Sequence, residues 1–396
     1  MKVALVHDWL TGMRGGERVL ERVCQMFPDA PIFTLLWNRG TVSSGIESHR
    51  IVTSFLQRLP GARTRYREYL PLFPRAAESL DLSGFDAVIS TSHCVAKGAR
   101  VPAGCFHLSY VLTPMRYVWD LEQTYFPPGR YPWPLSAYVR HACARLREWD
   151  VATTTRVPAL VACSHHVAER IRRHWNRNAV VVHPFIEAQR FTAASGPRDY
   201  LLVAGALAPY KRVDLAIEAC RRLGVRLVIA GSGPAKGGLE RKGSGVEFTG
   251  WVSDERMASL YAGARGLLFP GEEDFGLVPL EAMASGCPVV ALSRGGAMET
   301  VAAGASAEDL APLGRGEPAR VAGGVVFAEQ TAESLTRAIE RLLRSEWNSA
   351  QLRARAASFS PEAFERGLRE AFESAFSTWK LTRPATFRLV GVGSET

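Results

Sequence analysis

The sequence predicts an α/β protein built from two Rossmann-like, doubly wound lobes that face each other across a cleft. Short apolar runs alternate with helical stretches along the whole chain, which is typical of parallel sheets covered by helices. A chain of 396 residues with 47% hydrophobic content exceeds the size at which one core keeps growing. Small residues and a Gly-Pro pair gather at Thr192–Arg198, after which the alternation restarts, so a linker between domains is expected there.

The expected domains are an N-terminal lobe over residues 1–190, a linker over 191–198 and a C-terminal lobe over 199–360. Residues 361–396 are expected to form a helix that packs back on the N-terminal lobe. In the first lobe a helix should start after Gly16 and another should run from about Leu135 to Thr154. The strands expected there are Val3–Val6, Ala87–Ser90, His107–Val111, Leu160–Cys163 and Val180–His183.

The C-terminal lobe repeats the alternation. Its expected strands are Tyr200–Ala204, Arg226–Ala230, Gly266–Phe269, Val289–Leu292 and Gly324–Phe327. The helices expected between and after them lie near Val213–Arg222, Asp254–Ala262, Val278–Ala284 and Ala332–Arg344.

The net charge of +9 belongs to the first half of the chain. Up to Arg190 there are 24 basic and 15 acidic residues, whereas 24 of each follow. A basic half indicates an anionic partner, either a membrane surface or a phosphate-bearing substrate. Nucleic acid is not expected, because no nucleic-acid motif accompanies the charge.

Residues 55–75 interleave arginines with aromatic and aliphatic side chains, which is the composition of an interfacial membrane anchor. A core-packing segment with solvated arginines is the alternative, and three prolines interrupt any long amphipathic helix. The chain has no apolar run long enough to span a membrane and no secretory signal pattern at its start. Its seven cysteines lack metal-ligand spacing, which favours reduced thiols in a cytoplasmic protein.

Three segments could carry chemistry. Gly12–Glu17 joins the first strand to the first helix, and glycines there allow close approach of a ligand, although such a segment is often only a turn. In Val203–Ala219 a helix is expected to open at Pro209, with Lys211 and Arg212 in its first turn. Cations are unfavourable there, so an anionic ligand such as a diphosphate is favoured over a solvated pair.

The third segment runs from Glu272 to Ala291. If Gly276 opens a helix, Glu281 lies in its second turn and faces the cleft together with Glu273. Two carboxylates there can accept hydrogen bonds from sugar or ribose hydroxyls, while the N–H groups after Gly276 face phosphate. Ordinary surface acids are the alternative, but the small residues of AMASGCPVVA favour close packing of this helix on its strand.

Together these segments resemble family 4 of the retaining glycosyltransferases, which have the GT-B fold. Glu273 and Glu281 are similar to the ends of the family's E-x7-E signature, and Gly295–Val301 resembles the segment that closes the donor pocket. The resemblance covers nearly the whole chain, and Ser109–Asp120 resembles a bacterial exopolysaccharide and O-antigen branch that contains many mannosyltransferases.

The resemblance implies transfer of a hexose, with mannose favoured, from a GDP- or UDP-sugar to a lipid-linked or polysaccharide acceptor. It implies a peripheral protein on the inner face of the plasma membrane and no metal cofactor. Lys211 would stabilise the departing diphosphate and Glu273 would orient the transferred sugar. The implied donor-binding residues are Gly15, Gly16, Arg212, Phe275, Gly276, Leu277 and Glu281.

Two positions depart from the family pattern. Ala206 stands where many relatives have arginine, and Leu112 stands where many have histidine. A catalytically weak relative that serves as a subunit of a polysaccharide assembly complex is therefore an open alternative. A nicotinamide-dependent oxidoreductase is excluded, because neither lobe has a G-x-G-x-x-G segment with an acidic residue about 20 residues on.

Overall fold

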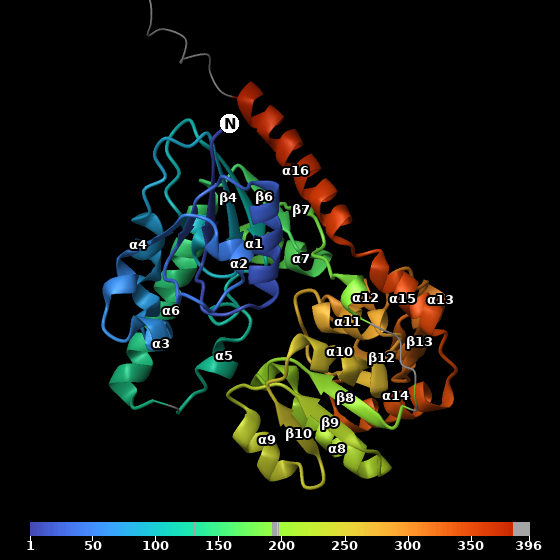
Figure 1. Cartoon of the computed structure of the whole chain (residues 1–396). Helices are drawn as coiled ribbons and strands as arrows, with labels where there is room; N and C mark the ends of the chain where they lie inside the picture. The colour runs from blue at the N-terminus through green and yellow to red at the C-terminus, as the bar shows by residue number, and fades with distance from the viewer. Residues whose placement is uncertain (130, 192–195, 197, 383–396) are drawn as a thin grey trace, which may run out of the picture.

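Two parallel α/β lobes make up the protein, as a computed structural model of the chain shows (Figure 1). The structure describes residues 1–129, 131–191, 196 and 198–382. The expected two-lobe, Rossmann-like fold is confirmed. Most of the linker expected over 191–198 and the last part of the segment expected over 361–396 lie outside the described residues.

The N-terminal sheet has the order β3-β2-β1-β4-β5-β6-β7, and every pair of neighbours is parallel. Its strands are β1 Val3–His7, β2 Ile32–Thr34, β3 Ile51–Thr53, β4 Ala87–Ser92, β5 Phe106–Val111, β6 Ala159–Ala162 and β7 Val180–Val181. Its α-helices are α1 Gly15–Met26, α2 Ser44–Glu47, α3 Ala62–Arg65, α4 Phe73–Glu78, α5 Glu122–Tyr125, α6 Trp133–Thr154 and α7 His165–Trp175. The central strands β1, β4 and β5 are buried along their whole length, as expected for apolar runs in a parallel sheet.

The C-terminal sheet has the order β10-β9-β8-β11-β12-β14-β13, in which only β13 runs antiparallel to its neighbour. Its strands are β8 Tyr200–Ala204, β9 Leu227–Ala230, β10 Glu247–Gly250, β11 Ala264–Phe269, β12 Val289–Leu292, β13 Ala319–Val321 and β14 Gly324–Phe327. Its α-helices are α8 Val213–Leu223, α9 Lys236–Lys242, α10 Asp254–Gly263, α11 Leu277–Ala284, α12 Ala297–Thr300, α13 Ala307–Leu310, α14 Ala332–Arg344 and α15 Ser349–Ala357.

Four strands were missing from the sequence prediction: β2, β3, β10 and β13. Each has only three or four residues, and three of them lie at a sheet edge. Strands of the same length such as Leu227–Ala230 were predicted because they are wholly apolar, whereas β10 (EFTG) and β13 (ARV) contain charged residues and β2 and β3 have only three residues each. The sheet itself selects them, because a neighbouring strand satisfies their backbone groups.

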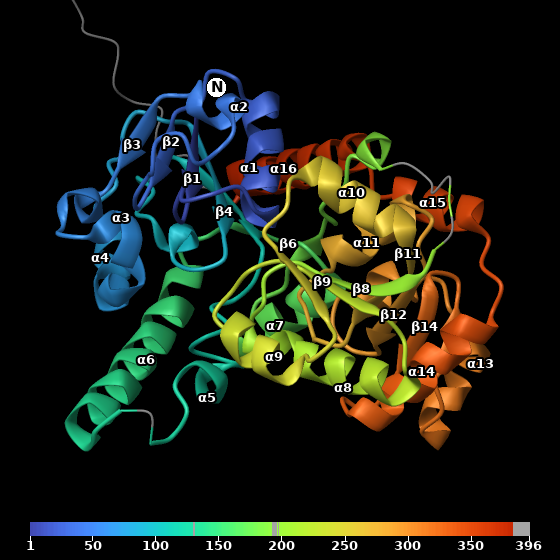
Figure 2. The ribbon, with the colours of Figure 1, turned by 60° about the horizontal axis from the view of Figure 1, so that its bottom comes forward.

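Residues 55–75 fold into short helical turns at the outer end of the N-terminal lobe. Figure 2 shows α3 and α4 there, on the side away from the C-terminal lobe. Tyr66 and Phe73 are buried and pack against Trp9, whereas Phe55 is exposed. Most of the aromatic bodies in this segment therefore serve the core, as the alternative interpretation expected. Its five arginines at 58, 63, 65, 67 and 75 are exposed.

The last described helix, α16 Pro361–Leu381, crosses from the C-terminal lobe and runs along the N-terminal lobe (Figure 1). Phe372, Phe376 and Trp379 surround Phe106 of β5, with ring centroids 5.3, 5.3 and 5.4 Å from it. Phe364 packs edge-on against Tyr110, which is also fully buried. The chain thereby connects the two lobes a second time, through an aromatic cluster.

Truncating the buried ring of Phe372 should destabilise the N-terminal lobe. Phe372→Ala is expected to lower the free energy of unfolding by about 3 kcal/mol, because it leaves a cavity beside Phe106. Urea denaturation of this variant and of Glu373→Ala, an exposed change on the same helix, measures the difference. Equal stability of the two variants would contradict this role of α16.

Candidate functional site

The candidate site lies where the strand order of the C-terminal sheet reverses, between β8 and β11. In open α/β sheets, ligands bind outside the carboxyl ends of strands at such a switch point. The chain leaves β8 through Gly205 and Ala206, and it leaves β11 through Pro270 and Gly271. These two exits carry Lys211 and Glu273, the two residues predicted to act on the donor.

Lys211 and Glu273 form an ion pair, with Lys211 Nζ 2.6 Å from Glu273 Oε1. Their side chains are only 14% and 21% exposed, so the pair is largely screened from water. Gly271 permits this approach, since a Cβ atom there would lie 2.6 Å from the Lys211 Cα. The structure thus brings together two of the predicted residues that are far apart in the sequence.

Arg212 does not lie where the sequence analysis expected it. Pro209–Lys211 form a 3₁₀ turn, Arg212 has a φ of 52°, and α8 begins only at Val213. The prediction that both cations occupy the first turn of a helix is therefore wrong, because the left-handed residue separates the turn from the helix. The Arg212 side chain binds Asp214, with Nη2 3.1 Å from Oδ2.

Glu281 lies in the second turn of α11, as the sequence indicated. Gly276, with a φ of 102°, occupies the N-cap position of this helix. The Tyr261 hydroxyl donates a hydrogen bond of 2.8 Å to Glu281 Oε2. Burial raises the pKa of Glu281 above its ordinary value despite that hydrogen bond.

A cavity of about 480 Å³ adjoins Glu281 between the two lobes. The N-terminal lobe contributes Arg18 and Arg22 of α1, and the C-terminal lobe contributes Asp254 and Met257 of α10. A space of this size, lined by charged and apolar groups from both lobes, suits a small polar ligand. Glu281 is positioned to accept hydrogen bonds from hydroxyl groups within it.

The two glycines at the start of α1 meet different neighbours. A Cβ atom on Gly15 would lie 2.9 Å from Leu277 Cδ1 of the C-terminal lobe, and one on Gly16 would lie 3.0 Å from Leu112 Cδ1 of its own lobe. Glycine at position 15 therefore permits the close approach of the lobes, whereas glycine at position 16 leaves room for Leu112. Leu112, one of the two departures from the family pattern, packs directly on this loop.

Phe275 is predicted to bind the donor, but its ring points elsewhere. It is 5% exposed, stacks on His183 at 5.4 Å and packs against Phe359. Only its backbone is left to face a ligand at the Glu273 loop. Gly296 of the closing segment donates a 2.8 Å hydrogen bond from its N–H to the Glu273 carbonyl, which fixes this loop from the other side.

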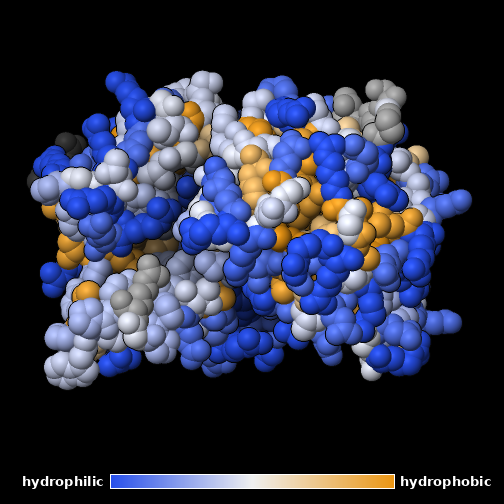
Figure 3. Space-filling model, turned by 90° about the horizontal axis from the view of Figure 1, so that it is seen from below, coloured by the Kyte–Doolittle hydropathy of each residue, from blue (hydrophilic) through white to orange (hydrophobic). Residues whose placement is uncertain are grey.

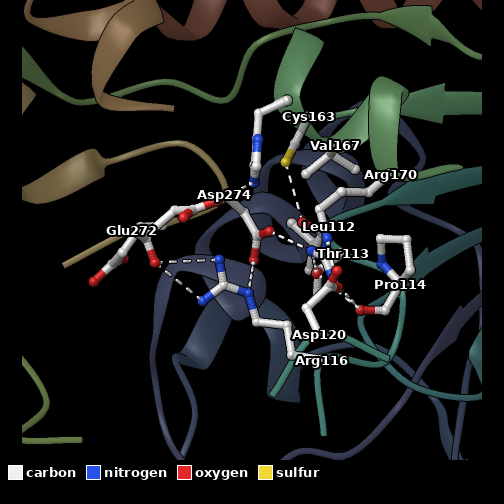
Figure 4. A network of polar contacts seen from close by, with 12 residues as sticks. Leu112, Thr113, Pro114, Arg116, Asp120, Cys163, Val167, Arg170, Glu272 and Asp274 are labelled. Atoms are coloured by element: carbon white, nitrogen blue, oxygen red, sulfur yellow. Dashed lines mark hydrogen bonds and ion pairs between the residues drawn. The ribbon is translucent and has the colours of Figure 1, made fainter. Parts of the chain in front are cut away.

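Sequence reasoning gave no role to the network that joins the Glu273 loop to the N-terminal lobe (Figure 4). Asp274 accepts from Arg116 Nε at 2.9 Å and from Arg170 Nη1 at 2.6 Å. The Ser164 hydroxyl donates to the Asp274 carbonyl. Arg116 lies in the quoted segment Ser109–Asp120, but a partner that is more than 150 residues away in the sequence leaves no local signal.

A second contact between the lobes contains the groups most suited to hold a metal ion among the described residues. Ligand atoms of His165, His183 and Glu299 lie within 4.8 Å of one another. Both Glu299 oxygens already accept hydrogen bonds, from the His165 and His166 N–H groups and from His183 Nε2 at 2.9 Å. Hydrogen bonding therefore accounts for this cluster, and the expectation of no metal cofactor stays a prediction.

Comparison with known families concerns the lobe that carries this site. Residues 198–345 match the family model described as "Glycosyl transferases group 1". The match includes Lys211, Glu273 and Glu281.

Curated relatives match part of the chain. A GDP-mannose-dependent alpha-(1-6)-phosphatidylinositol dimannoside mannosyltransferase of Mycobacterium tuberculosis is 39% identical over 142 residues, which are 33% of this chain and 32% of that protein. A D-inositol 3-phosphate glycosyltransferase of Mycolicibacterium smegmatis is 34% identical over 177 residues, 38% of this chain and 39% of that protein. The chain spans between a third and a half of the length of such relatives.

Solved structures resemble the whole chain. Sucrose-phosphate synthase from Thermosynechococcus elongatus superposes with a TM-score of 0.70 and 18% identity, over 96% of this chain and 100% of that one. HepE of Anabaena in complex with UDP superposes with a TM-score of 0.65 and 15% identity, over 94% of this chain and 100% of that one. At this identity the likeness supports the two-lobe GT-B fold alone.

Glu281→Gln should change the pH dependence of stability. Because the native pKa of Glu281 is raised, its contribution to stability is present at low pH and is lost as the pH rises through that pKa. Glutamine is neutral throughout and can still accept from Tyr261. The free energy of unfolding of the variant, relative to wild type, should therefore increase between about pH 5 and about pH 8.

Urea denaturation without ligand at both pH values measures this change. Glu373→Gln, on the exposed face of α16, serves as the control for loss of a carboxylate. A constant difference between wild type and Glu281→Gln across the pH range would show that the carboxylate is not held in an unfavourable environment.

Proposed function

We propose that the chain, whose C-terminal lobe matches the group 1 glycosyltransferases, moves a hexose from a nucleotide-diphosphate sugar to a lipid-linked or polysaccharide acceptor. The observation that carries the proposal is the Lys211–Glu273 ion pair at the β8/β11 switch point, together with Glu281 in the wall of the cavity between the lobes. A cation for a leaving group and two acceptors for hydroxyls are what such a donor requires.

In this transfer the bond between the anomeric carbon and the β-phosphate oxygen breaks, and its electron pair goes to the phosphate. The acceptor oxygen forms the new bond and loses its proton to the departing phosphate. Lys211 stabilises the charge that develops on the diphosphate, while Glu273 holds the sugar hydroxyls and Glu281 those of the ribose. As in the family that the chain resembles, configuration at the anomeric carbon is retained and no metal is needed.

Mannose is the favoured sugar. Two of the mycobacterial relatives are named as GDP-mannose-dependent mannosyltransferases, which supports GDP-mannose as the first donor to test. The acceptors in the names of these relatives are not carried over to this chain. The branch that Ser109–Asp120 resembles favours an exopolysaccharide or lipopolysaccharide acceptor. UDP-sugars are the second donor class, in keeping with the UDP bound to the HepE structure.

A weakly active relative that binds nucleotide sugar within an assembly complex is the alternative function. Ala206 and Leu112 favour it, because each is apolar where many members of the family that the chain resembles have a polar side chain. Release of nucleotide from the donor distinguishes the two, since an assembly subunit binds the donor without turning it over.

Substitutions of Lys211 and Glu281 should affect different kinetic constants. With GDP- and UDP-sugars and a membrane lipid extract, Lys211→Ala is expected to lower kcat about 100-fold, because phosphate charge peaks as the bond breaks. Glu281→Gln is expected to raise the KM for donor about 10-fold with a smaller effect on kcat. Released nucleotide is measured for both, and small, equal effects on both parameters would contradict these roles.

We also propose that the basic N-terminal lobe docks on an anionic membrane at the cytoplasmic face. Among the described residues no helix is both long and apolar enough to cross a bilayer. Hydrophilic residues cover much of the face in Figure 3 and interrupt its hydrophobic areas. With Tyr66 and Phe73 in the core and Phe55 exposed, we expect the attraction of this segment to come mainly from its exposed arginines.

Changing Arg58, Arg63, Arg65 and Arg67 to Ser should release the protein from anionic vesicles. Each basic residue near such a surface contributes about 1 kcal/mol, and the attraction weakens as salt rises. Co-sedimentation with anionic and neutral liposomes measures the effect. If the variant pellets as wild type does, the positive charge of this lobe serves a phosphate-bearing acceptor instead.

A further inference from the structure

The C-terminal lobe brings little positive charge to the diphosphate. Of the positions considered above for this contact, Ala206 has no charge and Arg212 is turned toward Asp214. Lys211 remains, and its ammonium group is already 2.6 Å from Glu273. A nucleoside diphosphate leaves with more negative charge than one shared ammonium can offset, so a second cation is needed near the Glu273 loop.

Arg116 reaches this loop from the opposite lobe. It follows β5, and its Nε donates to Asp274 Oδ2 at 2.9 Å, one residue from Glu273. Its guanidinium carbon lies 5.1 Å from the ring centroid of Tyr210, the neighbour of Lys211. The side chain is 15% exposed, which screens it from water without sealing it off. Arg116 and Lys211 therefore approach the same loop from the two lobes.

The remaining N–H groups of Arg116 are poorly used. Within the part of the chain that the structure describes, Nη1 and Nη2 reach only the Glu272 carbonyl, at 3.4 and 3.5 Å (Figure 4). Arg170, 3% exposed beside it, is instead saturated, because it donates to Asp120, Thr113, the Pro114 carbonyl and Asp274. Arg170 fixes the network, whereas the Nη1 and Nη2 groups of Arg116 are held only by long hydrogen bonds and form a fork of the kind that binds phosphate oxygens in pairs.

We propose that Arg116 is the second cation of the donor site and binds the diphosphate across the cleft, beside Lys211. This inference rests on the proposed function and adds a residue from the N-terminal lobe to it. Asp274 holds the Nε of Arg116 and leaves Nη1 and Nη2 to meet the phosphate oxygens. Because the two cations belong to different lobes, the site is complete only when the lobes are closed.

Binding of nucleotides without a sugar tests the contact directly. Arg116→Ala should weaken GDP and UDP binding at least 10-fold by calorimetry, while guanosine and uridine bind within about 2-fold of wild type, because nucleosides carry no phosphate. Arg116→Lys keeps the charge but loses the fork, so its affinity for GDP and UDP should lie between those of wild type and Arg116→Ala. Arg353→Ala, an exposed arginine on α15, is the matched control and should behave as wild type.

A rescue separates a cation of the site from an anchor of the loop. Ala206 lines the same small cavity as Lys211 and Glu273, so Ala206→Arg in the Arg116→Ala background should restore most of the lost GDP or UDP affinity. If Arg116 only held Asp274, then Asp274→Asn would reproduce the loss and the added arginine would not rescue it. That pair of results overturns the inference.

The failures of the two proposals are distinguishable. Wild-type protein that binds neither GDP nor UDP and releases no nucleotide from any donor overturns the proposed function and this inference together. If wild type binds GDP and UDP and both Arg116→Ala and Arg116→Lys bind them with the same affinity as wild type, the role of Arg116 alone is overturned. Thermal unfolding of each variant confirms that it is folded before binding is compared.

Discussion

Asp274 inserts between Arg116 and Arg170 of the opposite lobe, and the position of the candidate site depends on this contact. The carboxylate stands next to Glu273, so whatever holds Asp274 also holds the residue that pairs with Lys211. Charge-assisted hydrogen bonds between largely buried groups are short and directional, so they hold the loop in one position. An ion pair exposed to water would hold it less firmly. The N-terminal lobe thereby takes part in positioning Glu273, which lies in the C-terminal lobe.

The second connection between the lobes has a different physical basis. Helix α16 returns from the C-terminal lobe and buries its aromatic face on β5 around Phe106. Aromatic burial is strong but not directional, so it keeps the lobes together without prescribing the placement of a single carboxylate. Polar contacts at the cleft then decide how the lobes meet, and Gly15 opposite Leu277 lets them come close.

The charge of the N-terminal lobe divides between these tasks. Arginines at the cleft, such as Arg116 and Arg170, are engaged with the C-terminal lobe. Those of residues 58–75 are exposed at the outer end of the lobe, over an aromatic core that includes Tyr66 and Phe73. The excess charge is therefore spread over two surfaces, one suited to a phosphate-bearing donor and one to an anionic surface.

The sequence by itself determined the two-lobe fold, the long central strands and the helix that carries Glu281. Apolar runs such as Tyr200–Ala204 and Val289–Leu292 are local signals, since a buried parallel strand must be apolar along its length. The position of Glu281 on α11 followed from helical spacing. Tertiary structure alone decided the short edge strands, the left-handed Arg212 and the inward turn of the Phe275 ring. It also decided the approach of Arg116 to Asp274, because contacts between residues so far apart in the chain arise from the packing of whole lobes and leave no periodic trace in the sequence.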